Sequence, residues 1–160
     1  MFALLLGLAV VLCDQLTKQA VRANLTYSES RPLIDGFFNL VYFRNDGAAW
    51  NLLSGHGLIL ILISTIVLIL LLIYHRSFLQ NRLLDRIILG LMVGGIIGNL
   101  IDRIRFGWVT DFLDFQFGAT YHYPSFNVAD SSICIAVTLY IVANFFASKK
   151  NVAIEERRDG

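Results

Sequence analysis

The sequence is poor in charged side chains, which make up only 16% of its 160 residues. Soluble domains carry about a quarter of their residues as charges, so this composition argues against one. The net charge of +1 provides no basic surface, and no nucleic-acid partner is expected. Cys13 and Cys134 are too few for a disulfide framework. Because both fall in apolar segments, we expect them to be buried packing residues.

Two common hydrolase motifs are also missing. The sequence contains neither H-E-x-x-H, which binds zinc, nor G-x-S-x-G, which presents a nucleophilic serine. The three histidines, His56, His75 and His122, are scattered along the chain. We therefore expect no metal and no cofactor.

The sequence is rich in long apolar runs, and 56% of its residues are hydrophobic. About 20 mostly apolar residues cross a bilayer core as a helix. The predicted fold class is therefore an all-α integral membrane protein with four transmembrane helices. We expect one membrane-embedded domain over residues 1–160, with spans at about 2–23, 58–74, 83–101 and 128–147 and a polar tail over 148–160.

The connections between these spans differ in length and in basic residues. A short turn with Arg76, Arg82 and Arg86 joins the second span to the third, and two longer loops join the others. Because Lys and Arg concentrate on the cytoplasmic side, we place this turn and both termini in the cytoplasm. Residues 37–43 and 109–123 of the longer loops are rich in aromatic residues, which favours a small sheet on the outer membrane surface.

Polar residues gather near the outer ends of the predicted spans. A charge at the bilayer centre costs about 2.5–3.5 kcal/mol, so such residues are candidates for function. Asp14 and Lys18 lie four residues apart and can pair, either as a structural tether or as an edge of the site. Asn99, Asp102 and Arg103 also share one helix face, and Arg103 can reach Asp102 or the membrane interface.

Glycines recur along the third span at helical spacing. Gly90, Gly94 and Gly98 are four residues apart, and Gly95 lies beside them. Small residues at this spacing let helix backbones approach closely. We expect neighbouring helices to pack tightly against the third span.

Asp111 and Asp130 are the favoured catalytic pair, because neither has a partner at helical spacing. Two carboxylates a few ångströms apart share one proton, so one can act as base and the other as acid. Such a pair hydrolyses a peptide bond without a metal. From the residues alone, Asp114 remains a competitor, Asp111 could be a solvated loop residue, and Asp130 could cap a helix before Ser131.

Intramembrane carboxylates are also typical of proton relays, so a small proton-coupled transporter is the alternative function. The four spans show no inverted repeat of the kind common in transporters. A different class of intramembrane aspartyl protease carries a G-x-G-D element, which is absent from this sequence.

Five short elements, in order, resemble those of lipoprotein signal peptidases, also called signal peptidase II. They are D-Q-L-T-K at 14–18, N-D-G-A-A-W at 45–50, G-N-L-I-D-R at 98–103, V-T-D-F at 109–112 and F-N-V-A-D-S-S at 126–132. The resemblance implies a multi-pass protein of the bacterial cytoplasmic (inner) membrane with both termini cytoplasmic. It also implies that the outer loops form a β-cradle and a helix over the site.

The resemblance further implies an aspartic endopeptidase with Asp111 and Asp130 as catalytic residues, in preference to Asp114. The implied partners are membrane lipid and diacylglyceryl-modified prolipoproteins, cut just before the lipidated cysteine, with globomycin-type inhibitors. Trp50 and Phe112 are expected either to line an apolar groove for the substrate or to anchor the interface. The residues implied to support the site or bind substrate are Asp14, Lys18, Asn45, Asn99, Asp102, Arg103 and Asn127.

Overall fold

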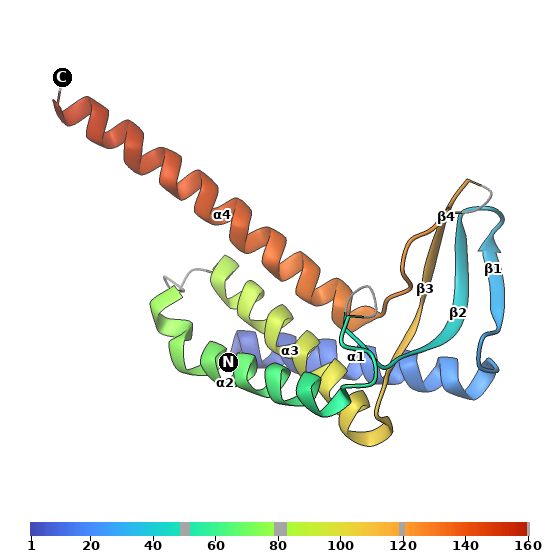
Figure 1. Ribbon diagram of the computed structural model, residues 1–160. Helices are drawn as coiled ribbons and strands as arrows, with labels where there is room; N and C mark the ends of the chain where they lie inside the picture. Colours follow the sequence, from blue (N-terminus) through green and yellow to red (C-terminus); the bar gives the residue numbers. More distant parts are fainter. Residues whose placement is uncertain (49–51, 79–82, 119–120, 160) are drawn as a thin grey trace.

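The computed structural model describes residues 1–48, 52–78, 83–118 and 121–159. In this part of the chain, four helices are long and apolar enough to cross a membrane, which confirms the four predicted spans. They are α1 (Phe2–Asn24), α2 (Gly57–Phe78), α3 (Leu83–Phe106) and α4 (Val128–Asp159) (Figure 1).

Three of the predicted helix ends fall short of those of the structure, the end of α2 by four residues, since it lies at Phe78 rather than Tyr74. Helix α3 continues five residues past the predicted end at Ile101, to Phe106. Its last turn contains Arg103 and Arg105, which end the apolar run but favour a helix C-terminus because they complement its partial negative charge. Helix α4 likewise runs on through the polar tail to Asp159, far beyond its apolar part, which ends at Phe146.

Helix α3 lies at the centre and packs against α1, α2 and α4. The glycines of α3 allow the neighbouring helices to pack closely against it. A Cβ on Gly94 would lie 2.7 Å from the carbonyl oxygen of Gly7 in α1, and one on Gly95 would lie 2.6 Å from that of Ala129 in α4. Both distances are too short for a side chain, so the prediction that helices approach α3 closely is confirmed.

A four-stranded antiparallel sheet extends beyond one end of the helices, as predicted. Its strands are β1 (Ser30–Ile34), β2 (Phe38–Asn45), β3 (Val109–Phe117) and β4 (Tyr121–His122), in the order β1-β2-β3-β4. The start of α1, the end of α2, the start of α3 and the end of α4 lie at the opposite end of the bundle (Figure 1). The described loop residues 46–48 and 52–56 form turns and bends without a helix, and residues 49–51, with Trp50, lie outside the described part.

A bulge in β2 decides which side chains face the helices. Between two matched pairs, Leu40 with Leu113 and Phe43 with Asp111, β2 has one residue more than β3. Because side chains alternate along a strand, this extra residue shifts the following positions of β2 to the other face. Asn45 thereby comes to the face of Asp111.

The other face of the sheet packs on the end of α1. Phe112 joins Val21, Leu25 and Tyr42 in a small buried hydrophobic cluster. The expectation that Phe112 lines the substrate groove is therefore wrong, because it follows Asp111 on the strand and points to the opposite side.

The expectation that both cysteines are buried is also wrong, since Cys13 and Cys134 are exposed. Cys13 lies on an exposed part of α1, and Cys134 lies on a part of α4 that lines a groove. Apolar sequence context therefore predicts burial poorly in a chain of this class.

Candidate active site

Asp111 of β3 and Asp130 of α4 line one groove. The groove has a volume of about 690 Å³ and lies where the sheet meets the outer ends of α3 and α4. Arg103 contributes a positive charge to its wall, and Phe43 and Ile133 are among its apolar residues. Asp111 and Asp130 belong to segments 19 residues apart, and the start of α4 brings them to the same place.

Asn127 fixes the position of Asp130 by capping α4. The Oδ1 atom of Asn127 accepts a hydrogen bond from the Asp130 N–H at 3.0 Å, and Asp130 Oδ2 accepts the Asn127 N–H at 3.3 Å. This is the reciprocal arrangement of a capping box. The capping role considered for Asp130 is therefore partly right, but its other oxygen, Oδ1, receives the Asn99 amide at 2.7 Å.

Asp111 is held by two asparagine amides. Asn127 Nδ2 donates to Asp111 Oδ1 at 2.7 Å, and Asn45 Nδ2 donates to Asp111 Oδ2 at 3.0 Å. Asn45 Oδ1 accepts the Gly47 N–H at 3.0 Å, which fixes the orientation of the Asn45 amide. Asn127 thus contacts both aspartates, one through its side-chain nitrogen and the other through its side-chain oxygen.

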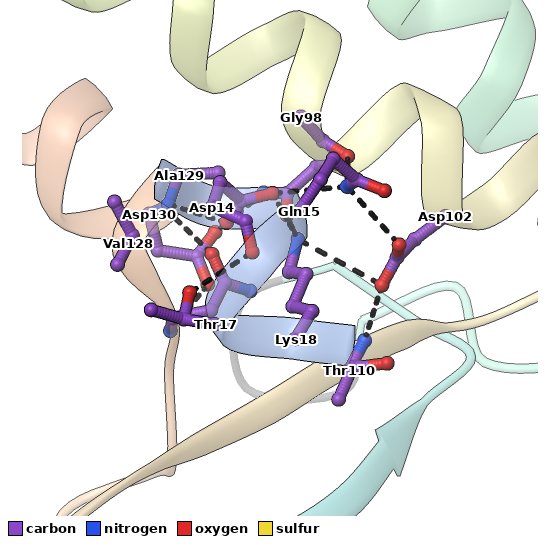
Figure 2. Close-up of polar contacts among 12 residues, drawn as sticks. Asp14, Gln15, Thr17, Lys18, Gly98, Asp102, Thr110, Val128, Ala129 and Asp130 are labelled. Carbon is purple, nitrogen blue, oxygen red and sulfur yellow. Dashed lines mark hydrogen bonds and ion pairs between the residues drawn. The ribbon is translucent and has the colours of Figure 1, made fainter. Parts of the chain in front are cut away.

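Lys18 and Asp14 form a buried ion pair, and Lys18 contacts the residue that binds Asp130 (Figure 2). Lys18 Nζ is 2.8 Å from Asp14 Oδ2 and donates to Asn99 Oδ1 at 2.9 Å, and no part of either charged side chain is exposed. Because an ammonium group only donates, Asn99 must turn its oxygen toward Lys18 and its nitrogen toward Asp130. The predicted pair of Asp14 and Lys18 is confirmed, and it orients the group that contacts Asp130.

Asp14 also ties α1 to α4. Its Oδ1 atom accepts the backbone N–H of Ala129 at 2.9 Å, in the first turn of α4 (Figure 2). A carboxylate at a helix N-terminus is favourable because the free N–H groups carry partial positive charge. Gly98 makes this approach possible, since a Cβ there would lie 2.6 Å from Asp14 Oδ2.

Asp102 is fully buried and joins the end of α3 to the start of β3. Its Oδ2 atom accepts the Thr110 N–H at 2.9 Å, which places the strand that carries Asp111 (Figure 2). The neighbouring Arg103 points elsewhere and donates to the carbonyl oxygen of Gly47 at 3.0 Å. Arg103 was expected to reach either Asp102 or the membrane interface. It does not bond to Asp102, and its guanidinium faces the groove instead.

Arg22 is a supporting residue that the sequence analysis missed. Its NH1 atom donates to Thr110 Oγ1 at 2.7 Å and lies 3.4 Å from Asp102 Oδ2, while its guanidinium stacks over Phe106. The sequence did contain a signal for Arg22, because charged residues at positions 14, 18 and 22 are spaced by four and share one face of α1. Gln15, the second residue of the D-Q-L-T-K element, donates to Asp102 Oδ1 at 3.2 Å.

Asp114, the competitor of Asp111, is not among the residues that line this groove. It accepts hydrogen bonds from Asn39 Nδ2 at 2.8 Å and is 2.9 Å from His122 Nδ1. These partners, Asn39 and His122, do not line the groove either, whereas Asp111 and Asp130 both do. The geometry therefore separates Asp114 from Asp130.

Burial raises the pKa of Asp111 to about 7, and the neighbouring charge of Asp130 adds to this effect. The hydrogen bonds from Asn45 and Asn127 act in the opposite direction, since they favour the ionised carboxylate. Asp111 is therefore partly protonated at neutral pH, as a member of an acid–base pair needs to be.

Comparison with known proteins identifies close relatives. A family model described as signal peptidase (SPase) II matches residues 6–146. The lipoprotein signal peptidase of Bacillus pumilus is 40% identical over 150 residues, covering 94% of this chain and 96% of the relative. That of Syntrophotalea carbinolica is 41% identical over 145 residues, covering 89% of each.

Solved structures of bacterial membrane enzymes are also similar to this chain. A bacterial membrane enzyme solved by the in meso method at 2.3 Å resolution superposes with a TM-score of 0.83 at 34% identity, covering 92% of this chain and 90% of the other. A second, at 1.9 Å resolution, gives a TM-score of 0.77 at 36% identity, covering 88% and 90%. Both overlap nearly the whole length of either chain.

Proposed function

The chain belongs to the signal peptidase II family, and we propose that it removes signal peptides from diacylglyceryl-modified prolipoproteins in the bacterial inner membrane. The bond cut is the one before the lipidated cysteine, and the catalytic residues are Asp111 and Asp130. One observation carries this proposal. Two carboxylates from different elements line one groove where the sheet meets the helix bundle, and three asparagine amides hold their oxygens.

In the proposed mechanism the pair carries one proton. Asp130, in the first turn of α4, lies where the helix dipole favours a carboxylate, and it takes a proton from water. The hydroxide adds to the scissile carbonyl carbon, and Asp111 donates its proton to the departing amine as the C–N bond breaks. The products are a signal peptide ending in a carboxylate and a lipoprotein beginning with the lipidated cysteine.

The location of the groove suits this substrate. A cysteine that carries two acyl chains lies at the membrane surface, so its peptide bond needs catalytic groups at that depth. Arg103 donates to Gly47 at the wall of the groove, and a guanidinium there can stabilise negative charge on the carbonyl oxygen during attack. In the proposed orientation both termini are cytoplasmic and the sheet faces outward.

The family model and the relatives are peptidases, and they give no support to the transporter alternative. We also propose that globomycin-type inhibitors occupy the same groove, in place of the peptide beside the lipidated cysteine. A cyclic peptide that competes there is expected to raise KM without changing kcat.

The test is cleavage of a purified diacylglyceryl-modified prolipoprotein by purified protein in detergent, followed by gel shift. Wild type is expected to cleave, while Asp111→Asn and Asp130→Asn are expected to lose at least a thousand-fold in kcat, since each removes one half of the proton transfer. Asp114→Asn is the matched control, because it removes a buried carboxylate from the same strand.

Asp114→Asn is expected to keep at least a tenth of the wild-type rate. A near-normal rate in a folded Asp111→Asn or Asp130→Asn variant would leave the activity in place and refute the assignment of the pair. No cleavage by folded wild type would refute the activity itself, and solute uptake into vesicles would then test the transporter alternative.

A further inference from the structure

A second groove lies deeper in the helix bundle, toward the end that holds the termini. Its volume is about 450 Å³, and nearly all of its surface is apolar. The residues that define it, called the inner groove below, are Leu70, Tyr74, Ile88, Met92 and Tyr140, from α2, α3 and α4. Helix α3 forms its floor, because it packs between α2 and α4 (Figure 1).

The inner groove and the candidate active-site groove lie on the same faces of α3 and α4, at different levels of the bundle. Ile133 lines the outer groove and Tyr140 the inner one, and a spacing of seven residues is two helical turns. On α3, Arg103 and Met92 are eleven residues apart, which is three turns. From Asp130 to Tyr140 the distance along α4 is about 15 Å at 1.5 Å per residue.

We propose that the inner groove binds the apolar segment of the substrate's signal peptide as a helix. This inference rests on the proposed function, which places the cut bond between Asp111 and Asp130. A secretory signal peptide has about 7–15 apolar residues before its cleavage site and basic residues at the cytoplasmic side. From the catalytic pair, that segment must run inward through the membrane, and the inner groove lies in this direction.

The length and openness of the groove fit such a helix. Ten helical residues span about 15 Å, so the residue ten positions before the cut reaches the level of Tyr140. Helix α2 leaves much of its groove side uncovered, with Val67 and Leu70 43% and 48% exposed. Since lipid is as apolar as these side chains, recognition depends on close packing rather than on the hydrophobic effect.

The first experiment locates the signal peptide. A prolipoprotein with a benzophenone side chain ten residues before the cleavage site is bound to Asp111→Asn protein in lipid nanodiscs and irradiated. Because this variant is expected to leave the substrate whole, mass spectrometry can identify the labelled peptides. Labelling of Met92 or Tyr140 is expected. Labelling confined to other helix faces would overturn the inference.

The second experiment measures the effect of filling the groove. Leu70→Trp is compared with Ile69→Trp, because Leu70 and Ile69 are neighbours on α2 with 48% and 49% exposure, and only Leu70 lines the groove. Leu70→Trp is expected to raise KM at least ten-fold with little change in kcat, while Ile69→Trp keeps both values. Equal KM values for the two variants would mean that only lipid fills the groove.

Two further outcomes separate the alternatives. If a photoreactive acyl chain on the lipidated cysteine labels Met92 or Tyr140 and the signal peptide does not, the groove belongs to the lipid of the substrate and the inference is wrong. If wild type fails to cleave the prolipoprotein at all, the proposed function fails first, and this inference fails with it. Cleavage with an unchanged Leu70→Trp variant refutes the inference alone.

Discussion

Replacing Lys18 by methionine tests whether the buried ion pair stabilises the fold. Lys18 Nζ is 2.8 Å from Asp14 Oδ2 and 3.8 Å from Asp102 Oδ2, and none of the three side chains is exposed. The variant keeps the length and apolar part of the side chain but leaves two buried carboxylates without their shared cation. Removing one partner of a buried pair costs about 3–5 kcal/mol, because the remaining charge stays desolvated.

The expected loss is large enough to measure in detergent. For a chain of this size, 1 kcal/mol shifts Tm by roughly 2–4 °C, so Lys18→Met is expected to lower Tm by roughly 6–20 °C. Arg31→Met is the matched control, since Arg31 pairs with Glu29 at 2.6 Å but is 55% exposed. Exposed pairs contribute only about 0.2–1 kcal/mol, so this control is expected to shift Tm by a few degrees at most.

A double variant separates the lost charge from lost packing. Asp14→Asn removes one leftover negative charge but keeps an oxygen for the Ala129 N–H, so Asp14→Asn combined with Lys18→Met is expected to regain part of the lost Tm. The reasoning is refuted if Lys18→Met and Arg31→Met melt together. It is also refuted if the Tm losses of Asp14→Asn and Lys18→Met simply add in the double variant.

Two other variants test the hydrogen bonds of the pair and the packing of α3. Asn45→Ala removes a donor that favours ionised Asp111, so the pKa of Asp111 rises further above 7, and the alkaline limb of the kcat/KM profile is expected to move to higher pH. An unmoved limb would mean that another group controls it. Gly94→Ala places a Cβ 2.7 Å from the Gly7 oxygen and is expected to cost about 1–3 kcal/mol of stability. Gly57→Ala is its control, because a Cβ there meets only ordinary contacts at 3.5 Å, and similar melting of both variants would contradict the packing argument.

The helices could be predicted from the sequence because their signal is local. An apolar run of sufficient length identifies a span whatever lies beside it, and glycines at helical spacing identify the face where another helix approaches. The pairing of Asp14 with Lys18 was predictable for the same reason, since four residues along a helix place two side chains together. The ends of α3 and α4 were not, because basic residues end an apolar run without ending a helix.

The choice between Asp111 and Asp114 could not be made from local sequence. Both precede a phenylalanine in one strand, and only the folded structure shows that Asp111 lines the groove while Asp114 does not. The bulge between Leu40 and Phe43, which turns Asn45 toward Asp111, depends on how β2 pairs with a strand about 70 residues later. Resemblance to a family favoured Asp111, and no periodicity in the chain could have done so.

Charged side chains gather where the helices meet the sheet, and their sum bears on the protonation of the pair Asp111 and Asp130. Among the described residues of this layer there are four carboxylates and three basic side chains, namely Asp14, Asp102, Asp111, Asp130, Lys18, Arg22 and Arg103. Arg44 also lines the groove but is exposed, so one negative charge is in excess among the buried and half-buried members, and an uncompensated charge is costly away from water. A single proton on the pair neutralises the layer, in agreement with the pKa of about 7 for Asp111. In the proposed mechanism, the pair uses the same proton that neutralises this layer. Loss of the Lys18 charge is expected to favour binding of a second proton to the pair. The acid limb of the activity profile would then move toward neutral pH.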